Sequence, residues 1–389
     1  MCEEKVNNFL FNQNEGIGGF QNGKIDVRAV QPVTVNWTRQ SRFMGPNNPG
    51  IKWELEFNDE IFCSSPVVGR EDTIYFGTAY GFLYAVQSDG SIKWKLNLGK
   101  SLETPVIAED GTIYIATIGD FESKNHNLYA VSSEGIVKWS FKIDDLATFS
   151  PVIAKDGTVY VTTDGPKLFA ISPDGSLKWI YKGERGYWSN PVLSNDNTIY
   201  IGSRNNLYAI DERGKEKWKV SIARGSDNAS PVITDDGTLL FSAYDNQDDR
   251  SKLYAVNRDG TIRWIHTPDE VDIVTPPSLG KNGTIYVGGT YFELMAIGLD
   301  NSLKWSTKVE GFQVGPSLIG ADGVIYVGTY NNVRRPVSKV FAIHEDGTKK
   351  WLISIKGEMT WPALGDKMIY VLLGDFKSKT SKLVAIGEK

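Results

Sequence analysis

The sequence predicts an all-β protein, an eight-bladed β-propeller made of four-stranded antiparallel blades. Two observations carry the prediction: a repeat of about forty residues, and four short apolar runs within each copy of it. A third observation, the way in which the two ends of the chain complement each other, predicts that the ring of blades is closed.

The repeat is clearest in a basic residue followed by tryptophan, a pair that recurs at intervals of 39 to 46 residues. Lys precedes the tryptophan in seven copies, and Arg263 precedes it in the remaining one. The eight tryptophans are Trp53, Trp94, Trp139, Trp179, Trp218, Trp264, Trp305 and Trp351. Because one ring recurs at one register, we interpret these tryptophans as structural residues that fill the gaps between neighbouring blades.

Two further anchors occur eight times each, in the same order within every copy. The first is the run LYAV or a relative of it, which begins at Leu83, Leu128, Leu168, Leu207, Leu253, Leu294, Val340 and Leu383. The second is a proline before an apolar pair, at Pro66, Pro105, Pro151, Pro191, Pro231, Pro277, Pro316 and Pro362. Three anchors in constant order leave little room for a chance repeat.

Each copy contains four strand-like segments, as the stretch SPVIAKDGTVYVTTDGPKLFAISPDGSLKWIYKG (residues 150–183) illustrates. The segments SPVI, GTVYVTT, KLFAI and SLKWIY are short apolar or alternating runs, which is the pattern of β-strands. Asp-Gly turns separate the first strand from the second and the third from the fourth, and this dipeptide is a strong hairpin signal. Each copy is therefore predicted to be one antiparallel sheet, and radial stacking of eight such sheets makes a propeller.

The ends of the chain predict closure of the ring. The last copy stops at KLVAIGEK, after its third strand, whereas IKWELEF (Ile51–Phe57) is a fourth strand without the other three. Pairing the two would complete the eighth blade and remove two exposed strand edges. We therefore divide the chain into an N-terminal extension and lead-in, residues 1–50, and a propeller, residues 51–389.

The blade motif, represented by LYAVQSDGSIKW (residues 83–94), resembles the tryptophan-docking repeat of the quinoprotein-like, or PQQ-like repeat, propellers. The resemblance covers residues 51–389, and the stretch VNWTRQSRFMGPNNPGIKW (residues 35–53) resembles the lead-in of the simpler members. In style the chain is most similar to non-catalytic repeat propellers such as the barrel-assembly lipoprotein of the bacterial outer membrane. The resemblance implies a propeller of bacterial type and leaves its ligand open.

The catalytic members of that family, the pyrroloquinoline quinone (PQQ) dehydrogenases, place a disulfide between adjacent cysteines against the quinone and hold a metal ion with carboxylates. This chain has two cysteines, Cys2 and Cys63, which are not adjacent, and no such ligand set can be assigned. We therefore expect no PQQ, no other cofactor and no metal site. The acidic loop with Asp245, Asp248 and Asp249 could chelate calcium through oxygen ligands, but a solvated loop is the favoured interpretation.

Charge and hydropathy limit the partners. The net charge is −5, which argues against nucleic acid, and no apolar stretch is long enough to span a bilayer. The start of the chain, MCEEKVNNFL, contains no signal peptide, so we expect a cytoplasmic protein as written. The alternative is an exported or lipid-anchored protein whose leader was removed before Cys2. We expect a monomer.

Candidate ligand-binding residues lie in the segments that enter the first strand of each blade, because these segments vary while the blade framework does not. Four aromatic residues lie outside the docking register, and four charged residues accompany them. The aromatic residues are Phe149, Tyr187, Trp188 and Trp361, and the charged residues are Glu60, Glu103, Arg185 and Arg224. The aromatic residues either pack between inner strands or form a platform at the mouth of the central channel that the charged groups would orient.

Two functions remain open from the sequence. The first is a non-catalytic scaffold that holds a protein segment, a peptide, another small ligand or a glycan at the channel mouth or along a blade edge. The second is a cofactor-free enzyme, such as a cyclase, isomerase, lyase or hydrolase, in which a carboxylate beside Trp188 or Trp361 has a raised pKa. Convergence of these aromatics and carboxylates on one pocket would favour the enzyme, and apolar patches on the outer edges would favour the scaffold. No catalytic residue can be assigned.

Overall fold

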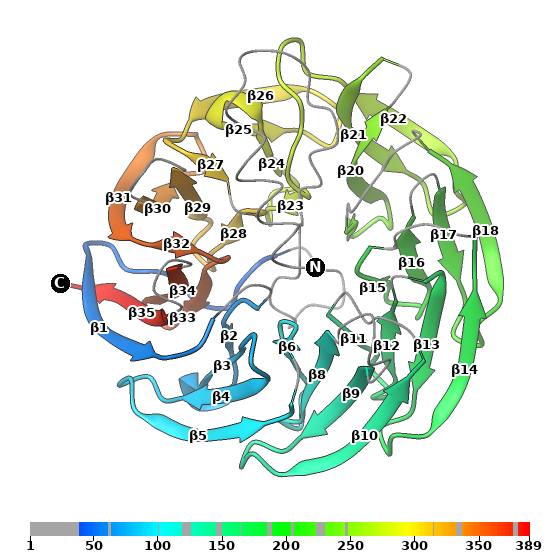
Figure 1. Ribbon diagram of the computed structural model, residues 1–389. Coiled ribbons are helices and arrows are strands. Elements are labelled where there is room, and N and C mark those ends of the chain that lie inside the picture. The colour runs from blue at the N-terminus through cyan, green and yellow to red at the C-terminus, as the bar shows by residue number, and fades with distance from the viewer. Residues whose placement is uncertain are drawn as a thin grey trace.

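A computed structural model gives the structure of the protein. It describes residues 39–60, 64–99, 101–118, 126–144, 150–163, 165–184, 189–203, 206–222, 230–245, 248–313, 315–331, 337–375 and 380–389. In these ranges the strands form eight antiparallel sheets arranged as a ring around a central axis (Figure 1), which confirms the predicted eight-bladed propeller. The helices assigned in these ranges are two short 3₁₀ turns, η1 (Arg70–Asp72) and η2 (Thr290–Phe292), and none is long enough to cross a bilayer.

The first four blades follow one another along the chain, each with its innermost strand first. Blade 1 contains β2 (Val67–Val68), β3 (Ile74–Gly77), β4 (Phe82–Val86) and β5 (Ile92–Asn97). Blade 2 contains β7 (Val106–Ile107), β8 (Ile113–Ile118), β9 (His126–Val131) and β10 (Val137–Ile143). Blade 3 contains β11 (Val152–Ile153), β12 (Val159–Thr162), β13 (Lys167–Ile171) and β14 (Leu177–Lys182). Blade 4 contains β15 (Val192–Leu193), β16 (Ile199–Gly202), β17 (Asn206–Ile210) and β18 (Glu216–Ser221).

The other four blades repeat this order, except that the outermost strand of blade 8 comes from the start of the chain. Blade 5 contains β19 (Val232–Ile233), β20 (Leu239–Asp245), β21 (Arg250–Val256) and β22 (Ile262–His266). Blade 6 contains β23 (Ser278–Leu279), β24 (Ile285–Gly289), β25 (Glu293–Ile297) and β26 (Leu303–Lys308). Blade 7 contains β28 (Leu318–Ile319), β29 (Ile325–Asn331), β30 (Val337–Ile343) and β31 (Lys349–Lys356). Blade 8 contains β33 (Ala363–Gly365), β34 (Met368–Asp375), β35 (Thr380–Glu388) and β1 (Pro49–Phe57).

Within the described residues, three blades carry a short additional strand that the sequence did not predict. These strands lie in entry segments and pair with the second strand of the blade that follows them. They are β6 (Ser101–Leu102), which pairs with β8, β27 (Phe312–Gln313), which pairs with β29, and β32 (Glu358–Met359), which pairs with β34. The two-residue first strand leaves part of the second strand's inner edge open, and the entry segment supplies partners there.

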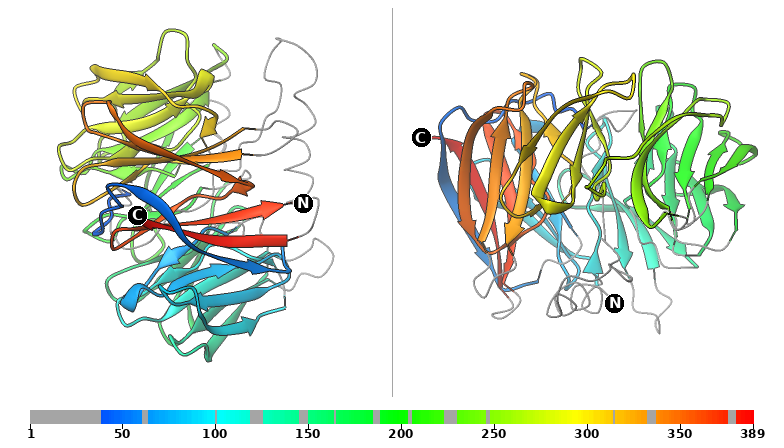
Figure 2. Two further views of the ribbon diagram at one scale, coloured as in Figure 1. Left: turned by 90° about the vertical axis from the view of Figure 1, so that its left-hand side faces the viewer. Right: turned by 90° about the horizontal axis from the view of Figure 1, so that it is seen from above.

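The predicted closure of the ring is confirmed. Strand β1 pairs antiparallel with β35 from Pro49 opposite Glu388 to Phe57 opposite Ser381. In Figure 2 the blue β1 runs beside the red β35 on the flank of the ring. Blade 8 is therefore assembled from both ends of the propeller sequence.

The hydrophobic core lies between blades. One buried cluster joins Leu83 and Ala85 of blade 1 to Ile113 and Val131 of blade 2, and similar clusters lie between other neighbours. A single four-stranded sheet buries too little apolar surface to be stable alone, so each blade depends on the two beside it.

Every tryptophan of the repeat docks on the segment that lies beside its blade, which is the next blade in seven cases and the lead-in segment for Trp351. Its indole Nε1 donates a hydrogen bond of 2.7–3.0 Å to a backbone carbonyl. In seven cases the carbonyl belongs to the turn between the third and fourth strands of the following blade, at Ser88, Ser133, Pro173, Glu212, Arg258, Leu299 and Glu345. Glycine follows closely in six of these turns, and a Cβ on Gly175, for example, would lie 2.8 Å from the Trp139 ring.

The lead-in segment, residues 39–48, directly precedes β1 and forms hydrogen bonds with three blades. Ser41 N donates to Ile319 O of blade 7 over 2.7 Å, and Gln40 Nε2 donates to Leu279 O of blade 6 over 2.9 Å. Lys367 N of blade 8 donates to Met44 O over 2.8 Å. These bonds connect blades 6, 7 and 8 through a segment that belongs to none of them.

Candidate binding face

In each antiparallel blade the first and third strands begin, and the second and fourth end, on one face of the ring, which we call the loop face. The described parts of the entry segments and of the loops that join second to third strands lie there. Five of the eight residues proposed for ligand binding, Phe149, Arg185, Tyr187, Trp188 and Arg224, lie outside the described residues, and so do Cys2 and Cys63. The described candidates are Glu60, Glu103 and Trp361. They come from the entry segments of blades 1, 2 and 8, which are consecutive in the closed ring.

Trp361 is buried between blades 7 and 8. Its side chain is 6% exposed and belongs to a cluster with Met359, Leu364 and Leu373. The indole lies directly on the backbone of Gly315, where a Cβ would come within 1.8 Å of Nε1. Trp361 therefore packs between blades 7 and 8, near the start of their innermost strands.

The two candidate glutamates differ in exposure. Glu103 is fully buried, and its N–H donates to Ala116 O over 3.0 Å, next to the additional strand β6. Glu60 is half-buried, and its carbonyl accepts a hydrogen bond of 2.8 Å from Ala79 N in the loop between β3 and β4.

Several other carboxylates of the entry segments hold the loops of their blades. Asp144 accepts from Lys167 Nζ over 2.9 Å, and Glu184 accepts from Lys219 Nζ over 2.5 Å. Glu310 accepts from Lys339 Nζ, and this contact lowers the pKa of the Glu310 carboxyl. These pairs place charges of both signs around the loop face and connect the entry segments to the third strand of the blade at Lys167 and Lys339 and to the fourth strand at Lys219.

The acidic loop of blade 5 binds a lysine of its own hairpin. Lys252 is buried and lies 3.1 Å from Asp245 Oδ2 and 2.5 Å from Asp248 Oδ2. Although burial by itself lowers the pKa of Lys252, the hydrogen bonds to these two carboxylates raise it overall. Tyr244 donates to Asp249, so each of the three aspartates proposed as calcium ligands contacts a side chain of this hairpin.

Sequence reasoning missed Asp59, which lies directly after the closing strand β1. Its side chain is buried, and Oδ1 accepts from Glu60 N over 2.8 Å and from Tyr80 N over 3.3 Å. Burial raises its pKa although these hydrogen bonds and the Lys95 charge act in the opposite direction. Oδ2 is buried, and no residue that the structure describes forms a hydrogen bond with it. The Asn-Asp pair at the end of a strand was a turn signal, but nothing in the sequence marked this aspartate as buried.

The outer edges of the blades expose aliphatic side chains at one recurring position, near the start of the fourth strand. Six residues there are 43–67% exposed, namely Ile51, Ile92, Ile136, Leu177, Ile262 and Leu303. Each lies on the outermost strand of its sheet or directly before it, and that strand has a partner on one side only in the described sheet order. Apolar side chains and an open strand edge thus occur together around the rim.

Comparison with known proteins places this architecture in a family. A family model described as outer membrane protein assembly factor BamB matches residues 26–182 and 249–360. The chain belongs to this family. As predicted, its motif is that of the PQQ-like repeat propellers.

Solved structures share the fold at low sequence identity. BamB from Moraxella catarrhalis superposes with a TM-score of 0.65 and 16% identity, over 86% of this chain and 97% of that one. The quinohemoprotein alcohol dehydrogenase ADHIIG from Pseudomonas putida HK5 superposes with a TM-score of 0.64 and 11% identity, over 90% of this chain and 80% of that one. The second of these structures is an alcohol dehydrogenase by its name, whereas the family model is named for an assembly factor, so the fold alone does not determine function.

A curated relative is similar over a shorter stretch. The uncharacterized protein YxaL from Bacillus subtilis (strain 168) is 36% identical over 101 residues, which is 25% of this chain and 25% of the relative. The match therefore spans a quarter of that relative's length.

Proposed function

We propose that this protein is a non-catalytic scaffold that binds a segment of a partner protein. The observation that carries the proposal is the ring of exposed aliphatic side chains on the open outer strands, Ile136 being the most exposed of them at 67%. Such edges suit the addition of an extended segment, whose backbone bonds to the free edge while its side chains contact the apolar rim. The family's description as an assembly factor for outer membrane proteins supports a protein partner.

The loop face is the second surface of the proposed scaffold. Several of its described carboxylates are bonded to lysines, as in the Asp144–Lys167 and Glu184–Lys219 pairs. Loops held in this way present a preorganised surface, which reduces the entropy lost when a partner binds. The aromatic residues Tyr187 and Trp188 are the proposed anchors of a ligand there.

A selection of peptides displayed on phage, with the immobilised full-length protein as bait, tests the proposal. We expect bound peptides with micromolar dissociation constants, and Ile136→Lys and Trp188→Ala identify which surface holds them. A tenfold loss with Ile136→Lys would place the peptide on the edge of blade 2, and the same loss with Trp188→Ala would place it on the loop face. Ile136→Lys should change the unfolding temperature by no more than about 1 °C, since Ile136 is 67% exposed and substitutions of exposed residues have small effects. For Trp188→Ala we also expect nearly unchanged thermal unfolding, and a large loss of stability would show that Trp188 is a framework residue. Failure to enrich any peptide would contradict the scaffold function.

A specific observation favours one alternative, a cofactor-free enzyme of the loop face. Asp59 is a buried carboxyl with a raised pKa and an unpartnered oxygen, near the exposed ring of Tyr80. A carboxyl in this state can act as a general acid or base. If Asp59→Asn abolished turnover of a substrate and left peptide binding unchanged, the enzyme would replace the scaffold as the preferred function.

A further inference from the structure

Arg39 lies on the inner wall of the ring. Ile319 N donates to Arg39 O over 3.1 Å, Ser41 N donates to Ile319 O over 2.7 Å, and Gln40 pairs with Ile319 in a parallel bridge. Ile319 ends β28, the innermost strand of blade 7 near the axis of the ring (Figure 1). Residues 39–41 therefore form an added strand edge on the channel side of blade 7.

The Arg39 side chain crosses from blade 7 to blade 6. One terminal nitrogen, Nη1, donates to the carbonyl of Pro277, immediately before β23. The side chain is buried, and its Nε has no hydrogen-bond partner among the described residues. Burial lowers the pKa of the guanidinium to about 9. No carboxylate in the described part of the chain forms an ion pair with Arg39.

This environment is unusual for a buried cation. Lys252, the other buried cation of the described residues, lies between the carboxylates of Asp245 and Asp248. A charge removed from water without a counter-ion is strongly destabilising, and buried arginines are normally paired. Ser317, whose carbonyl accepts from Ser278 Oγ beside Pro277, also has a buried hydroxyl without a partner. Two polar groups on the same part of the wall thus lack partners.

We propose that Arg39 is the anchor of a carboxylate-binding site on the channel wall between blades 6 and 7. A carboxylate suits the position because a planar guanidinium can donate two parallel hydrogen bonds to it, and one negative charge balances the single cation. The site is separate from the scaffold function proposed above, since it lies on the lead-in segment and involves neither the outer edges nor the loops.

The carboxylate has two chemically equivalent sources. One is a separate ligand or partner that enters the channel. The other is the chain itself, because the 38 residues before Arg39 contain the acidic residues Glu3, Glu4, Glu15 and Asp26. A tethered carboxylate has a high effective concentration and would exclude a free one until it is neutralised.

The test measures thermal unfolding of the full-length protein in sodium acetate and in sodium chloride at equal ionic strength. It compares the native chain with Arg39→Gln and Arg42→Gln. The same three chains are also prepared in a second background, in which Glu3, Glu4 and Glu15 are replaced by Gln and Asp26 by Asn. Arg42 is the matched control, an exposed arginine on the same lead-in segment that lies 4.6 Å from the Phe43 ring. In chains that keep Arg39 and whose site is unoccupied, acetate should raise the unfolding temperature by about 2 °C above the value in chloride. The increase should saturate as the acetate concentration rises.

Each outcome supports or overturns the site. An Arg39-dependent effect of acetate in the native chain supports a separate ligand. An effect that appears only after the four acids are neutralised supports a carboxylate of the chain itself. The proposal is overturned if acetate acts equally on chains that keep Arg39 and on chains that carry Arg39→Gln in both backgrounds, or has no effect in either.

Discussion

At each contact between blades, a repeat tryptophan donates one indole hydrogen bond, and we call this contact a tryptophan joint. Seven joints use a hairpin turn of the next blade as the acceptor, whereas the eighth uses the lead-in segment at a similar distance. Trp139 docks on Pro173 O over 2.7 Å, in a hairpin turn of the next blade. Trp351 cannot do so, because in blade 8 the third and fourth strands, β35 and β1, are not joined by a turn. It docks instead on Pro46 O of the lead-in segment, over 2.9 Å. The indole N–H therefore receives an equivalent acceptor from a segment 305 residues away in sequence.

We call the β1–β35 pair, together with the Trp351–Pro46 contact, the closing seam. The seam has the same indole hydrogen bond as the other joints, but no hairpin links the two strands that meet there. Gly45, just before Pro46, has its N–H bonded over 3.0 Å to the hydroxyl of Tyr326 in blade 7, and Glu388 accepts from Asn47 N and Asn48 N. Such contacts hold the lead-in in the place of a turn. In the seven other joints a covalent hairpin holds the acceptor, so the seam should be the position where the ring opens first.

The largest effect on stability is expected from creating a buried cavity, once in blade 8 beside the seam and once in the continuous blade 3. Leu383 of blade 8 and Leu168 of blade 3 occupy the same register and are both fully buried, but Leu383 faces Leu55 of strand β1, which no hairpin joins to β35. Leu→Ala should lower the free energy of unfolding by about 2–5 kcal/mol at either position. We expect the larger loss at Leu383, measured by urea denaturation, because the cavity also weakens the attachment of β1. An equal or larger loss at Leu168 would show that the seam is as strong as a continuous blade.

A smaller effect is expected from the indole hydrogen bond itself. Trp351→Phe and Trp139→Phe each retain an aromatic ring and remove the N–H donor. Each should lower the free energy of unfolding by about 1 kcal/mol, the usual contribution of one hydrogen bond, and the two values should agree. A negligible change at Trp351 with a normal one at Trp139 would indicate that Pro46 is a poorer acceptor than the turns.

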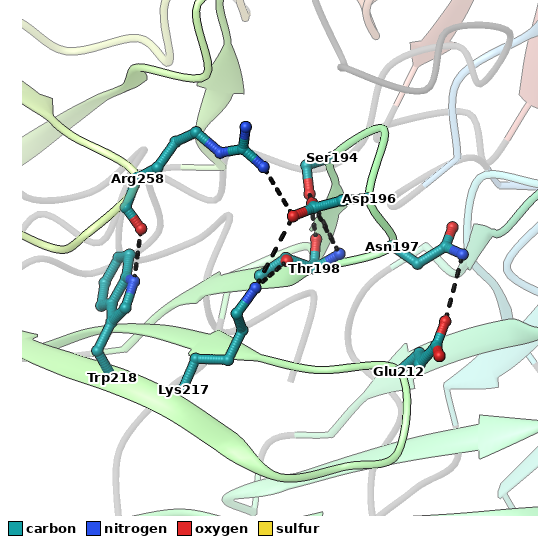
Figure 3. A network of polar contacts seen from close by, with 8 residues as sticks. All are labelled: Ser194, Asp196, Asn197, Thr198, Glu212, Lys217, Trp218 and Arg258. Atoms are coloured by element: carbon teal, nitrogen blue, oxygen red, sulfur yellow. Dashed lines mark hydrogen bonds and ion pairs between the residues drawn. The ribbon is translucent and has the colours of Figure 1, made fainter.

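The smallest effect concerns the joint between blades 4 and 5, which Figure 3 shows. Asp196 accepts from Arg258 Nη2 over 2.7 Å, and the carbonyl of Arg258 accepts from Trp218. Burial raises the pKa of Asp196, but hydrogen bonds from Ser194 and Thr198 and the nearby charges outweigh it and lower the pKa to about 2.

Because the folded-state pKa of Asp196 is below the ordinary value of 3.8, its contribution to stability is present above about pH 4. It is lost as the pH falls from about 4 towards 2. Both side chains are about half exposed, so we expect only tenths of a kcal/mol, and less at high salt. Thermal unfolding of the native chain and of Asp196→Asn should differ at about pH 6 and converge near pH 2. A difference independent of pH would contradict this role of the carboxylate.

Sequence reasoning recovered the blades because their signals are local. Asp-Gly turns, alternating strands and the Lys-Trp register repeat within about forty residues, and closure followed from counting strands at the two ends. One joint departs from the pattern: Asn301, with φ of 70°, stands where glycine occurs in six other turns. The departure is tolerated because Asn adopts the left-handed conformation more easily than most residues, and here its side-chain oxygen lies 2.8 Å from His266 Nδ1.

The candidate site was less predictable from sequence. Trp361 was expected either to pack or to bind a ligand, and its burial depends on Gly315, 46 residues earlier, which has no side chain to keep the indole away. The short strands β6, β27 and β32 were missed because two residues carry no periodicity. The burial of Asp59 likewise depends on Tyr80 and on the blade beyond it.

The sequence by itself determined the number of blades, their four strands and the meeting of the chain ends, because periodicity and turn chemistry act between residues close in the chain. Tertiary structure alone decided that Pro46 would bind Trp351, that Trp361 would lie on Gly315 and that Arg39 would be buried against blade 6. The contacts of Pro46 and Arg39 form only when the ring closes, and the contact of Trp361 with Gly315 forms only when blades 7 and 8 pack together. Burial depends on what the neighbouring blades place around a residue.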